Sequence, residues 1–127
     1  MAQPPVSPHR RVLVVDDDEH TRVAVATLLM AEGYDATVAA DGEEAASLLA
    51  SWRPDLVLTD LNMPRLDGRG LLLRVRSERP GTPVIVLSAR GCREGLASLE
   101  GLGAAGFFPK PVQVDELLAR IQDLIGH

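Results

Sequence analysis

The sequence predicts an α/β fold in which a parallel sheet of five strands is covered by helices on both faces. Short apolar runs without polar alternation, typical of strands buried on both faces, alternate with longer segments of helical periodicity. Right-handed crossovers between parallel strands leave few arrangements for such a chain. Five helices placed on the two faces then favour a doubly wound, flavodoxin-like sheet with the strand order 2-1-3-4-5.

The first ten residues, Met1–Arg10, contain Pro4, Pro5 and Pro8 and show no periodicity. We expect them to form a disordered extension, ahead of one domain that spans residues 11–127. The first strand is expected at Val12–Val15. Apolar and small residues at helical spacing then predict the first helix, which Gly33 should end. They are Thr21, Ala24, Val25, Leu28 and Leu29.

The second strand is expected at Ala36–Ala39, followed by a capping box formed by Asp41 and Glu44. That box begins a second helix, which Pro54 ends. Its buried residues should be Ala45, Leu48, Leu49 and Trp52. The central strand follows directly, because Leu56–Thr59 is an apolar, β-prone run that stops at Asp60.

The third helix is marked by Gly68, Leu71, Leu72 and Val75, and it should end before Pro80. The fourth strand is expected at Val84–Leu87. A helix over Arg90–Leu102 contains three glycines, which weaken it, so we expect it to be the most mobile helix. The last elements are a short strand around Phe107 and Phe108 and a terminal helix. That helix is marked by Val114, Leu117, Leu118, Ile121, Leu124 and Ile125.

Composition excludes several kinds of function. The 127 residues suit one domain, and the formal net charge of -5, without a basic block, argues against nucleic-acid or anionic-membrane binding by this domain itself. Cys92 is the only cysteine, so an internal disulfide and a cysteine-clustered zinc site are excluded. No apolar run is long enough for a membrane span. We therefore expect a cytoplasmic globular domain.

Polar side chains follow four of the predicted strands at the point where each strand ends. They are Asp16, Asp17, Asp60, Ser88 and Lys110. Any one of them alone is explained as a residue that terminates a strand or caps a loop. Because the carboxyl ends of parallel strands meet at one edge of a sheet, we expect all of them to converge there, where open α/β sheets place their chemistry.

The chemistry expected at this edge follows from its charges. Clustered carboxylates repel one another unless a cation intervenes, and oxygen-only ligands favour Mg²⁺ or Mn²⁺. The metal, the Lys110 ammonium and the Ser88 hydroxyl would together receive a tetrahedral oxyanion beside Asp60. Asp60 is then the expected nucleophile, which would form an aspartyl phosphate.

The segments VVDDD, PDLVLTDLNMPRLDG, VIVLSA and FFPKP resemble the motifs of the CheY-like receiver domain of two-component response regulators, and the resemblance extends from Arg11 to Ile125. It implies that Asp60 accepts a phosphoryl group from a phosphohistidine on a sensor histidine kinase or histidine phosphotransfer protein. The resemblance also implies the roles of the other site residues. Asp17 and Asp60 would bind Mg²⁺ directly, Asp16 through water and Asn62 through its backbone carbonyl, while Ser88 and Lys110 would contact the phosphoryl oxygens and the Lys110–Pro111 bond would be cis.

Further expectations concern the switch and the partners. The resemblance implies that Ser88 and Phe107 act as a switch, although Phe107 replaces the usual tyrosine and, as an alternative, is fixed core. Ala105, Gly106 and Leu96 depart from the ion-pair pattern of the winged-helix transcription-factor class. The surface for the phosphodonor should comprise His20, Thr21, Ala24, Pro111 and Val112. Asp18 has no implied role beyond that of an anion at a helix start.

Two other functions compete with a phosphorylation-controlled switch. A phosphatase of the haloacid-dehalogenase type also uses an aspartyl nucleophile with Mg²⁺, but it needs a second aspartate at the position of Asn62. A flavin-binding module would need a hydroxyl- and glycine-rich loop in place of DDDEHT.

We expect no enzymatic activity beyond catalysis of the domain's own phosphotransfer and autodephosphorylation. The chain stops after its last helix, so we expect a single-domain regulator that acts on a downstream effector protein, or a receiver domain fused to an output domain.

Overall fold

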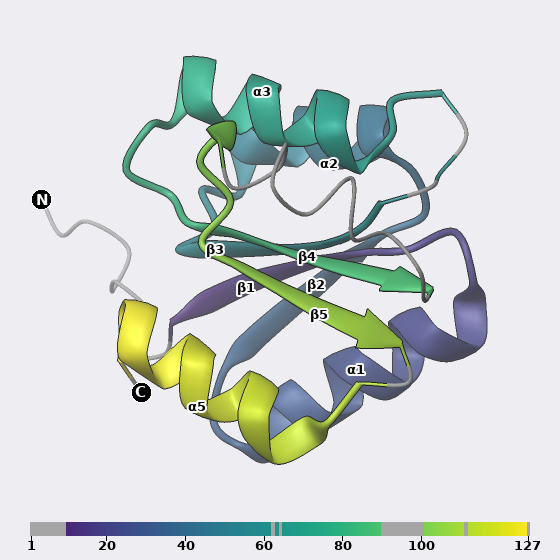
Figure 1. The fold of residues 1–127 in the computed structure, drawn as a ribbon, viewed down its shortest axis with the longest axis vertical. Helices are drawn as coiled ribbons and strands as arrows, with labels where there is room; N and C mark the ends of the chain where they lie inside the picture. Colours follow the sequence, from purple (N-terminus) through teal and green to yellow (C-terminus); the bar gives the residue numbers. More distant parts are fainter. Residues whose placement is uncertain (1–9, 62, 64, 90–100, 111, 127) are drawn as a thin grey trace, which may run out of the picture.

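The computed structural model describes residues 10–61, 63, 65–89, 101–110 and 112–126. Its strands form one parallel sheet in the order β2-β1-β3-β4-β5, which is the predicted order (Figure 1). The strands are β1 (Arg11–Val15), β2 (Asp35–Ala39), β3 (Leu56–Asp60), β4 (Val84–Ala89) and β5 (Gly106–Lys110). Each contains the apolar run that predicted it and extends beyond that run at one or both ends.

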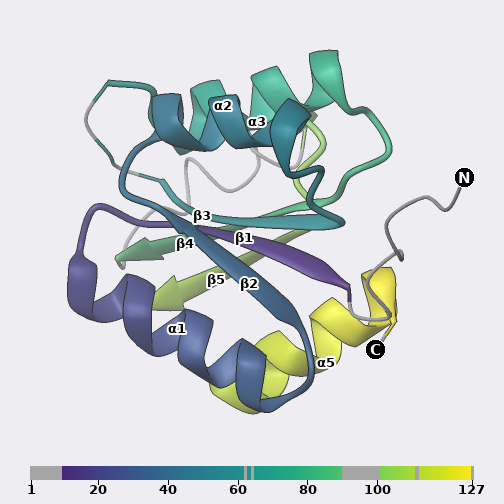
Figure 2. The ribbon, with the colours of Figure 1, turned by 180° about the vertical axis from the view of Figure 1, so that it is seen from behind.

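Four helices lie in the described part of the chain, against the five expected. They are α1 (Glu19–Ala31), α2 (Gly42–Ser51), α3 (Gly68–Glu78) and α5 (Val114–Ile125). The remaining helix was expected over Arg90–Leu102, and residues 90–100 lie outside the described residues. Helices α2 and α3 cover one face of the sheet, and α1 and α5 cover the other (Figures 1 and 2). None of the described helices has the length and apolar character that crossing a membrane requires.

The core consists of two apolar clusters, one on each face of the sheet. Successive residues of β1 alternate between them: Leu13 and Val15 pack towards α2 and α3, whereas Val12 and Val14 pack towards α1 and α5. Alternate side chains of a strand point to opposite faces, and here both faces are covered. This double burial explains why the strands appear in the sequence as uninterrupted apolar runs.

Aspartates cap the first three helices. Asp18 accepts a hydrogen bond from the backbone of Thr21, and Asp67 accepts one from Gly70. Asp41 accepts one from the backbone of Glu44, which confirms the N-cap of the predicted capping box. These caps fix the point at which each loop at the carboxyl edge of the sheet becomes a helix.

The first predicted helix is present as α1, but only part of its periodic stripe lies in the core. Ala24 is exposed, and Ala26 and Leu29 are the residues that α1 buries. Ala24 and Ala26 are two residues apart, about 200° around a helix, so they cannot share a face. Ala24 instead lines a surface groove with Thr21, Val25 and Leu28. The periodic stripe seen in the sequence is therefore largely the wall of this groove.

Candidate functional site

The predicted carboxylates meet at the carboxyl edge of the sheet. Val15 of β1 pairs with Thr59 of β3, so Asp16 and Asp60 each follow at the same level. One carboxylate oxygen from each of Asp16, Asp17 and Asp60 lies within 4.8 Å of the others. Asp16 and Asp60 are buried, with 2% and 8% of their surfaces exposed, whereas Asp17 is exposed. The cluster thus has a buried floor and one side open to solvent.

Lys110, the last residue of the edge strand β5, contacts two of these carboxylates. Its Nζ donates to Asp16 Oδ2 at 2.7 Å and lies 3.5 Å from Asp60 Oδ1. The β4–β5 register pairs Ala89 with Lys110 and Ser88 with Pro109, which brings Ser88 to the same edge. Ser88 is buried, with 1% of its surface exposed. The structure therefore clusters four of the predicted residues and places the fifth, Ser88, at the same edge of the sheet.

The turn after β1 is held by its own hydrogen bonds. Asp16 Oδ1 accepts from the backbone N–H of Asp18 at 2.9 Å. Arg22 of α1 reaches back and donates from Nη1 to the Asp16 carbonyl at 2.8 Å. Arg22 was not predicted from the sequence, because a contact between a helix side chain and a backbone carbonyl produces no motif in the sequence. Together these bonds orient the carboxylates of the turn.

The electrostatics of Asp60 reflect its burial. Desolvation raises the pKa of the Asp60 carboxyl above its ordinary value, and the neighbouring Asp16 charge raises it further, against the opposing effects of Lys110 and of the Leu61 N–H. Burial alone lowers the pKa of Lys110, but its hydrogen bond to Asp16 and the charges of Asp16 and Asp60 outweigh burial and raise that pKa. The site holds more negative charge than its single lysine balances.

The donor set fits a hard divalent cation. The three clustered side chains offer only carboxylate oxygens, which Mg²⁺ and Mn²⁺ prefer. A cation among them would also relieve the repulsion that raises the pKa of Asp60. Asn62 and Pro111 lie outside the described residues, so the expected backbone ligand and the expected cis bond stay predictions.

The start of α3 packs directly on the end of β3. The backbone N–H of Gly68 donates to the Leu61 carbonyl at 2.9 Å. A Cβ on Gly68 would lie 2.4 Å from the Asp60 carbonyl oxygen and 2.8 Å from Leu61 Cα, too close for any side chain. Asp60 Oδ1 accepts from the Leu61 N–H at 2.9 Å. Glycine at position 68 is thus required for this close approach, which fixes the backbone of Asp60.

The two residues expected to switch lie on adjacent strands. Phe107 pairs with Val86 in the β4–β5 register and packs, half-buried, against the cluster on the α2 and α3 side of the sheet. Nearby, Arg120 of α5 donates from both Nε and Nη2 to the Ala105 carbonyl, at 3.0 and 2.6 Å. The switching role of Ser88 and Phe107 stays a prediction.

A largely apolar groove of about 480 Å³ runs beside the acidic cluster. It is lined by His20, Thr21, Ala24, Val25, Leu28, Lys110, Val112 and Val114. Four of the five residues expected to face the phosphodonor therefore share one surface, and the fifth, Pro111, lies outside the described residues. Because Lys110 belongs to both the groove and the cluster, a partner in the groove would reach the site.

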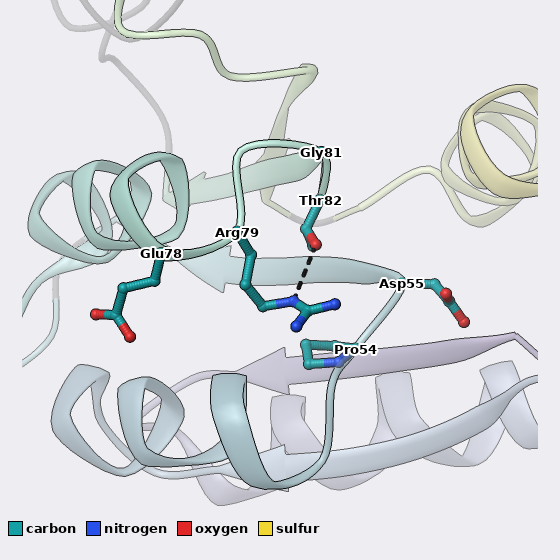
Figure 3. A pocket seen from close by; sticks show the side chains of 6 residues that line it. All are labelled: Pro54, Asp55, Glu78, Arg79, Gly81 and Thr82. Carbon is teal, nitrogen blue, oxygen red and sulfur yellow. Dashed lines mark hydrogen bonds between the residues drawn. The ribbon is translucent and has the colours of Figure 1, made fainter.

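A second hollow, of about 450 Å³, lies at the opposite, amino-terminal edge of the sheet (Figure 3). Its lining mixes acidic Asp55 and Glu78 with Arg79 and Thr82. The Arg79 Nε lies 3.4 Å from the Thr82 hydroxyl oxygen. No acidic cluster of the kind seen at the carboxyl edge occurs here among the described residues.

Comparisons with known proteins agree with the fold. A family model described as the response regulator receiver domain matches residues 12–122. Response regulator MprA of Mycolicibacterium vanbaalenii is 44% identical over 116 residues, which cover 91% of this chain and 50% of that protein. The chain thus spans about half the length of the curated relatives it matches.

Solved structures show the same likeness. The receiver domain of Francisella response regulator 1452 is 37% identical with a TM-score of 0.86, and the match covers 92% of this chain and 97% of that one. The Vibrio cholerae chemotaxis protein CheY4 is 32% identical with a TM-score of 0.84, over 91% of this chain and 98% of that one.

The sheet order and the acidic cluster at its carboxyl edge define a CheY-like α/β domain. The chain belongs to the response regulator receiver domain family, and it is a receiver domain of two-component signal transduction. The resemblance drawn from the motifs is thereby confirmed. The comparisons give no support to the phosphatase alternative.

Proposed function

We propose that this receiver domain is a switch whose Asp60 accepts a phosphoryl group from a phosphohistidine. The observation that carries the proposal is the position of Lys110 Nζ between Asp16 and Asp60, beside the exposed Asp17. If Asp60 only terminated a strand or capped a loop, the other carboxylates and the lysine beside it would have no role. Burial of a negatively charged cluster is unfavourable unless a ligand compensates it, so the arrangement is typical of a functional site.

The proposed reaction is a direct transfer between two nucleophiles. A carboxylate oxygen of Asp60 attacks phosphorus, and a P–O bond forms while the P–N bond to the donor imidazole breaks, with the electron pair leaving on nitrogen. Lys110, positioned by Asp16, places a positive charge beside the incoming phosphoryl oxygens. Ser88 supplies a hydroxyl donor at the same edge. The Leu61 N–H holds Asp60 Oδ1 and so fixes the orientation of the nucleophile.

Mg²⁺, with Mn²⁺ as a substitute, is the proposed metal, and when bound it neutralises the carboxylates and the phosphoryl oxygens. Asp17 and Asp60 would hold it directly and Asp16 through water. The backbone carbonyl of Asn62 is the fourth proposed ligand, on the strength of the family resemblance alone. In this proposal Asp16 has two tasks, because it also binds Lys110 through Oδ2.

The proposed partners follow from the family. A sensor histidine kinase or a histidine phosphotransfer protein donates the phosphoryl group, and a downstream effector or a fused output domain responds. The domain catalyses only its own phosphotransfer and dephosphorylation, in the cytoplasm. The helix expected over Arg90–Leu102 would connect β4 to β5 and carry the signal from Ser88 and Phe107. The relatives named response regulator MprA are about twice as long as the chain, so partners of a whole regulator belong to this proposal too.

Labelling by a small phosphodonor tests the acceptor. Incubated with acetyl phosphate and Mg²⁺, the protein should gain one phosphoryl group, measured by intact mass, and Asp60→Asn should gain none. Asp55→Asn is the matched control, because Asp55 precedes the same strand at its other end, where it accepts from the Arg11 N–H at 2.8 Å. Labelling of Asp60→Asn at the wild-type stoichiometry would contradict the assignment.

Partner docking is tested separately in the groove. Thr21→Arg places a long charged side chain on the groove wall, so it should slow transfer from the partner's phosphohistidine at least about tenfold, a loss typical of truncated or blocked interface contacts. Labelling by acetyl phosphate should stay at the wild-type rate. Equal slowing of both reactions would mean that Thr21 supports the site, where its backbone and hydroxyl bind Asp18, and not the partner.

A further inference from the structure

An ion pair joins the loop after β3 to the start of α2. Arg65 Nη1 lies 2.5 Å from Asp41 Oδ2. The Arg65 side chain is 62% exposed and the Asp41 side chain only 11%. Because its arginine is exposed to solvent, such an ion pair contributes little to folding stability by itself. Its place between two loops of the site gives it another role.

The backbone of Arg65 is held in an unfavourable conformation. Its φ of 67° lies in the left-handed region, which non-glycine residues rarely adopt. Such strain persists only where surrounding contacts over-determine the backbone, and it concentrates at functional sites. The next residue is tightly packed as well: a Cβ on Gly42 would lie 1.9 Å from the Leu66 carbonyl oxygen. The loop after β3 is thus pressed against the first residue of α2.

The β3–α3 loop follows Asp60 directly, and the loop before α2 contacts the turn after β1 through a backbone hydrogen bond. On one side, Gly68 closes the β3–α3 loop by packing on the Asp60 carbonyl and donating to Leu61. On the other side, Asp41 lies two residues after Ala39, whose carbonyl accepts from the Asp16 N–H at 3.2 Å. A contact between Arg65 and Asp41 therefore ties the turn that carries Asp16 to the loop that follows Asp60.

Asp41 is itself fixed by a second bond. Its Oδ1 accepts from the Glu44 N–H at 2.9 Å, while Oδ2 accepts from Arg65. These hydrogen bonds, that from the Glu44 N–H first, lower the pKa of Asp41, so its carboxylate stays charged at neutral pH. One aspartate thus anchors α2 and the β3–α3 loop at the same point.

We propose that Arg65 and Asp41 are positioning residues for the metal and phosphoryl site. Their ion pair fixes the described end of the β3–α3 loop, which packs through Gly68 on Asp60 and Leu61, and so holds the Asp60 backbone in place before the divalent cation arrives. This inference rests on the proposed function. The pair would raise the affinity for the metal although neither residue belongs to the cluster of carboxylates. Loss of the pair leaves the loop to be ordered at the moment of binding, which weakens binding.

Titration with MgCl₂ by calorimetry tests the proposal. The variants are Arg65→Asn, which removes the charge but tolerates the left-handed backbone, and Asp41→Ser, which removes the charge but keeps a helix cap. Each should raise the Mg²⁺ dissociation constant about threefold to tenfold, a loss at or below that typical of residues that orient metal ligands. The double variant should bind Mg²⁺ no more weakly than the weaker-binding single variant, because the two substitutions remove the same ion pair. Arg65→Lys should restore most of the affinity.

The kinetics separate positioning from general damage. With acetyl phosphate, the Mg²⁺ concentration for half-maximal labelling should rise by the same factor, while the rate at saturating Mg²⁺ stays at the wild-type value. Arg53→Asn is the matched control, because Arg53 also has a left-handed φ, 54°, but directly precedes Pro54 in the sequence. Pro54 lines the hollow at the amino-terminal edge, away from the acidic cluster (Figure 3). It should leave Mg²⁺ affinity unchanged.

Two results would overturn the inference. Unchanged Mg²⁺ affinity in both Arg65→Asn and Asp41→Ser shows that the pair does not position the site. A lower labelling rate at saturating Mg²⁺ with unchanged affinity shows that the pair only supports the fold. A wild-type protein that binds no Mg²⁺ and takes up no phosphoryl group fails earlier, and it overturns the proposed function instead.

Discussion

The two edges of the sheet carry similar residues in different electrostatic settings. At the amino-terminal edge, these polar side chains each have a hydrogen-bond partner of their own. Asp55 accepts from the Arg11 N–H, and Arg79 donates to the Thr82 hydroxyl. At the carboxyl edge, buried Asp16 and Asp60 share one lysine. Polar residues at strand ends are thus common to both edges. Burial together with unbalanced like charge is what distinguishes the functional edge.

The largest contrast between the edges should be in metal binding. Asp17→Asn should weaken Mg²⁺ binding about 100-fold, because it removes a proposed direct ligand and the loss of a residue that only orients a ligand already costs about 10–100-fold. Asp18→Asn should cost less than about threefold, since Asn still caps α1. Asp55→Asn at the other edge should have no effect. Calorimetric titration of the three variants measures this, and equal losses for Asp17→Asn and Asp18→Asn would show that the ligands are misassigned.

Glycine substitutions test the packing of the two edges. Gly68→Ala forces a Cβ against the Asp60 carbonyl and the Leu61 backbone, so it should lower the free energy of unfolding by about 1–3 kcal/mol. Gly81→Ala meets nothing within 4 Å at the amino-terminal edge, and it should change that free energy by less than about 0.5 kcal/mol. Urea denaturation compares the two. Similar values for both variants would remove the contrast in packing.

The pH dependence of stability should give the smallest effect. Burial and Asp16 raise the pKa of Asp60 in the folded protein above its unfolded value of 3.8. Between these two pKa values the folded state binds the proton and the unfolded state does not, so stability falls as the pH rises through this window. Without metal, Asp60→Asn should therefore be more stable than wild type at neutral pH, and the difference should shrink as the pH falls through that window. Thermal denaturation at several pH values checks the sign.

Elements fixed by local chemistry were predictable from the sequence. The strands were evident because both faces are buried, and Asp41 was evident as a cap from its spacing to Glu44. Asp16, Asp60 and Lys110 followed from one topological rule, that parallel strands end at the same edge. Each of these inferences needed only the residue, its neighbours in sequence and the sheet order.

Contacts between distant elements were not predictable. Arg22 binds a backbone carbonyl of the β1 turn, and Arg65 binds Asp41 across 24 positions of sequence. Neither arginine belongs to a spacing pattern, because tertiary packing alone brings it to its partner. Ala26, which α1 buries, was not predicted for a related reason: the groove beside α1 is apolar too, so periodicity did not separate its wall from the core.

The assignment of Asp60 as the phosphoryl acceptor can be tested by locating the phosphoryl group itself. After labelling with acetyl phosphate and Mg²⁺, borohydride reduces an aspartyl phosphate to homoserine, which peptide mass spectrometry then places in the sequence. This assignment predicts conversion at Asp60 and at no other aspartate, with none when Mg²⁺ is removed. Conversion at Asp16, Asp17 or Asp55, or labelled protein in which Asp60 stays intact, would contradict it.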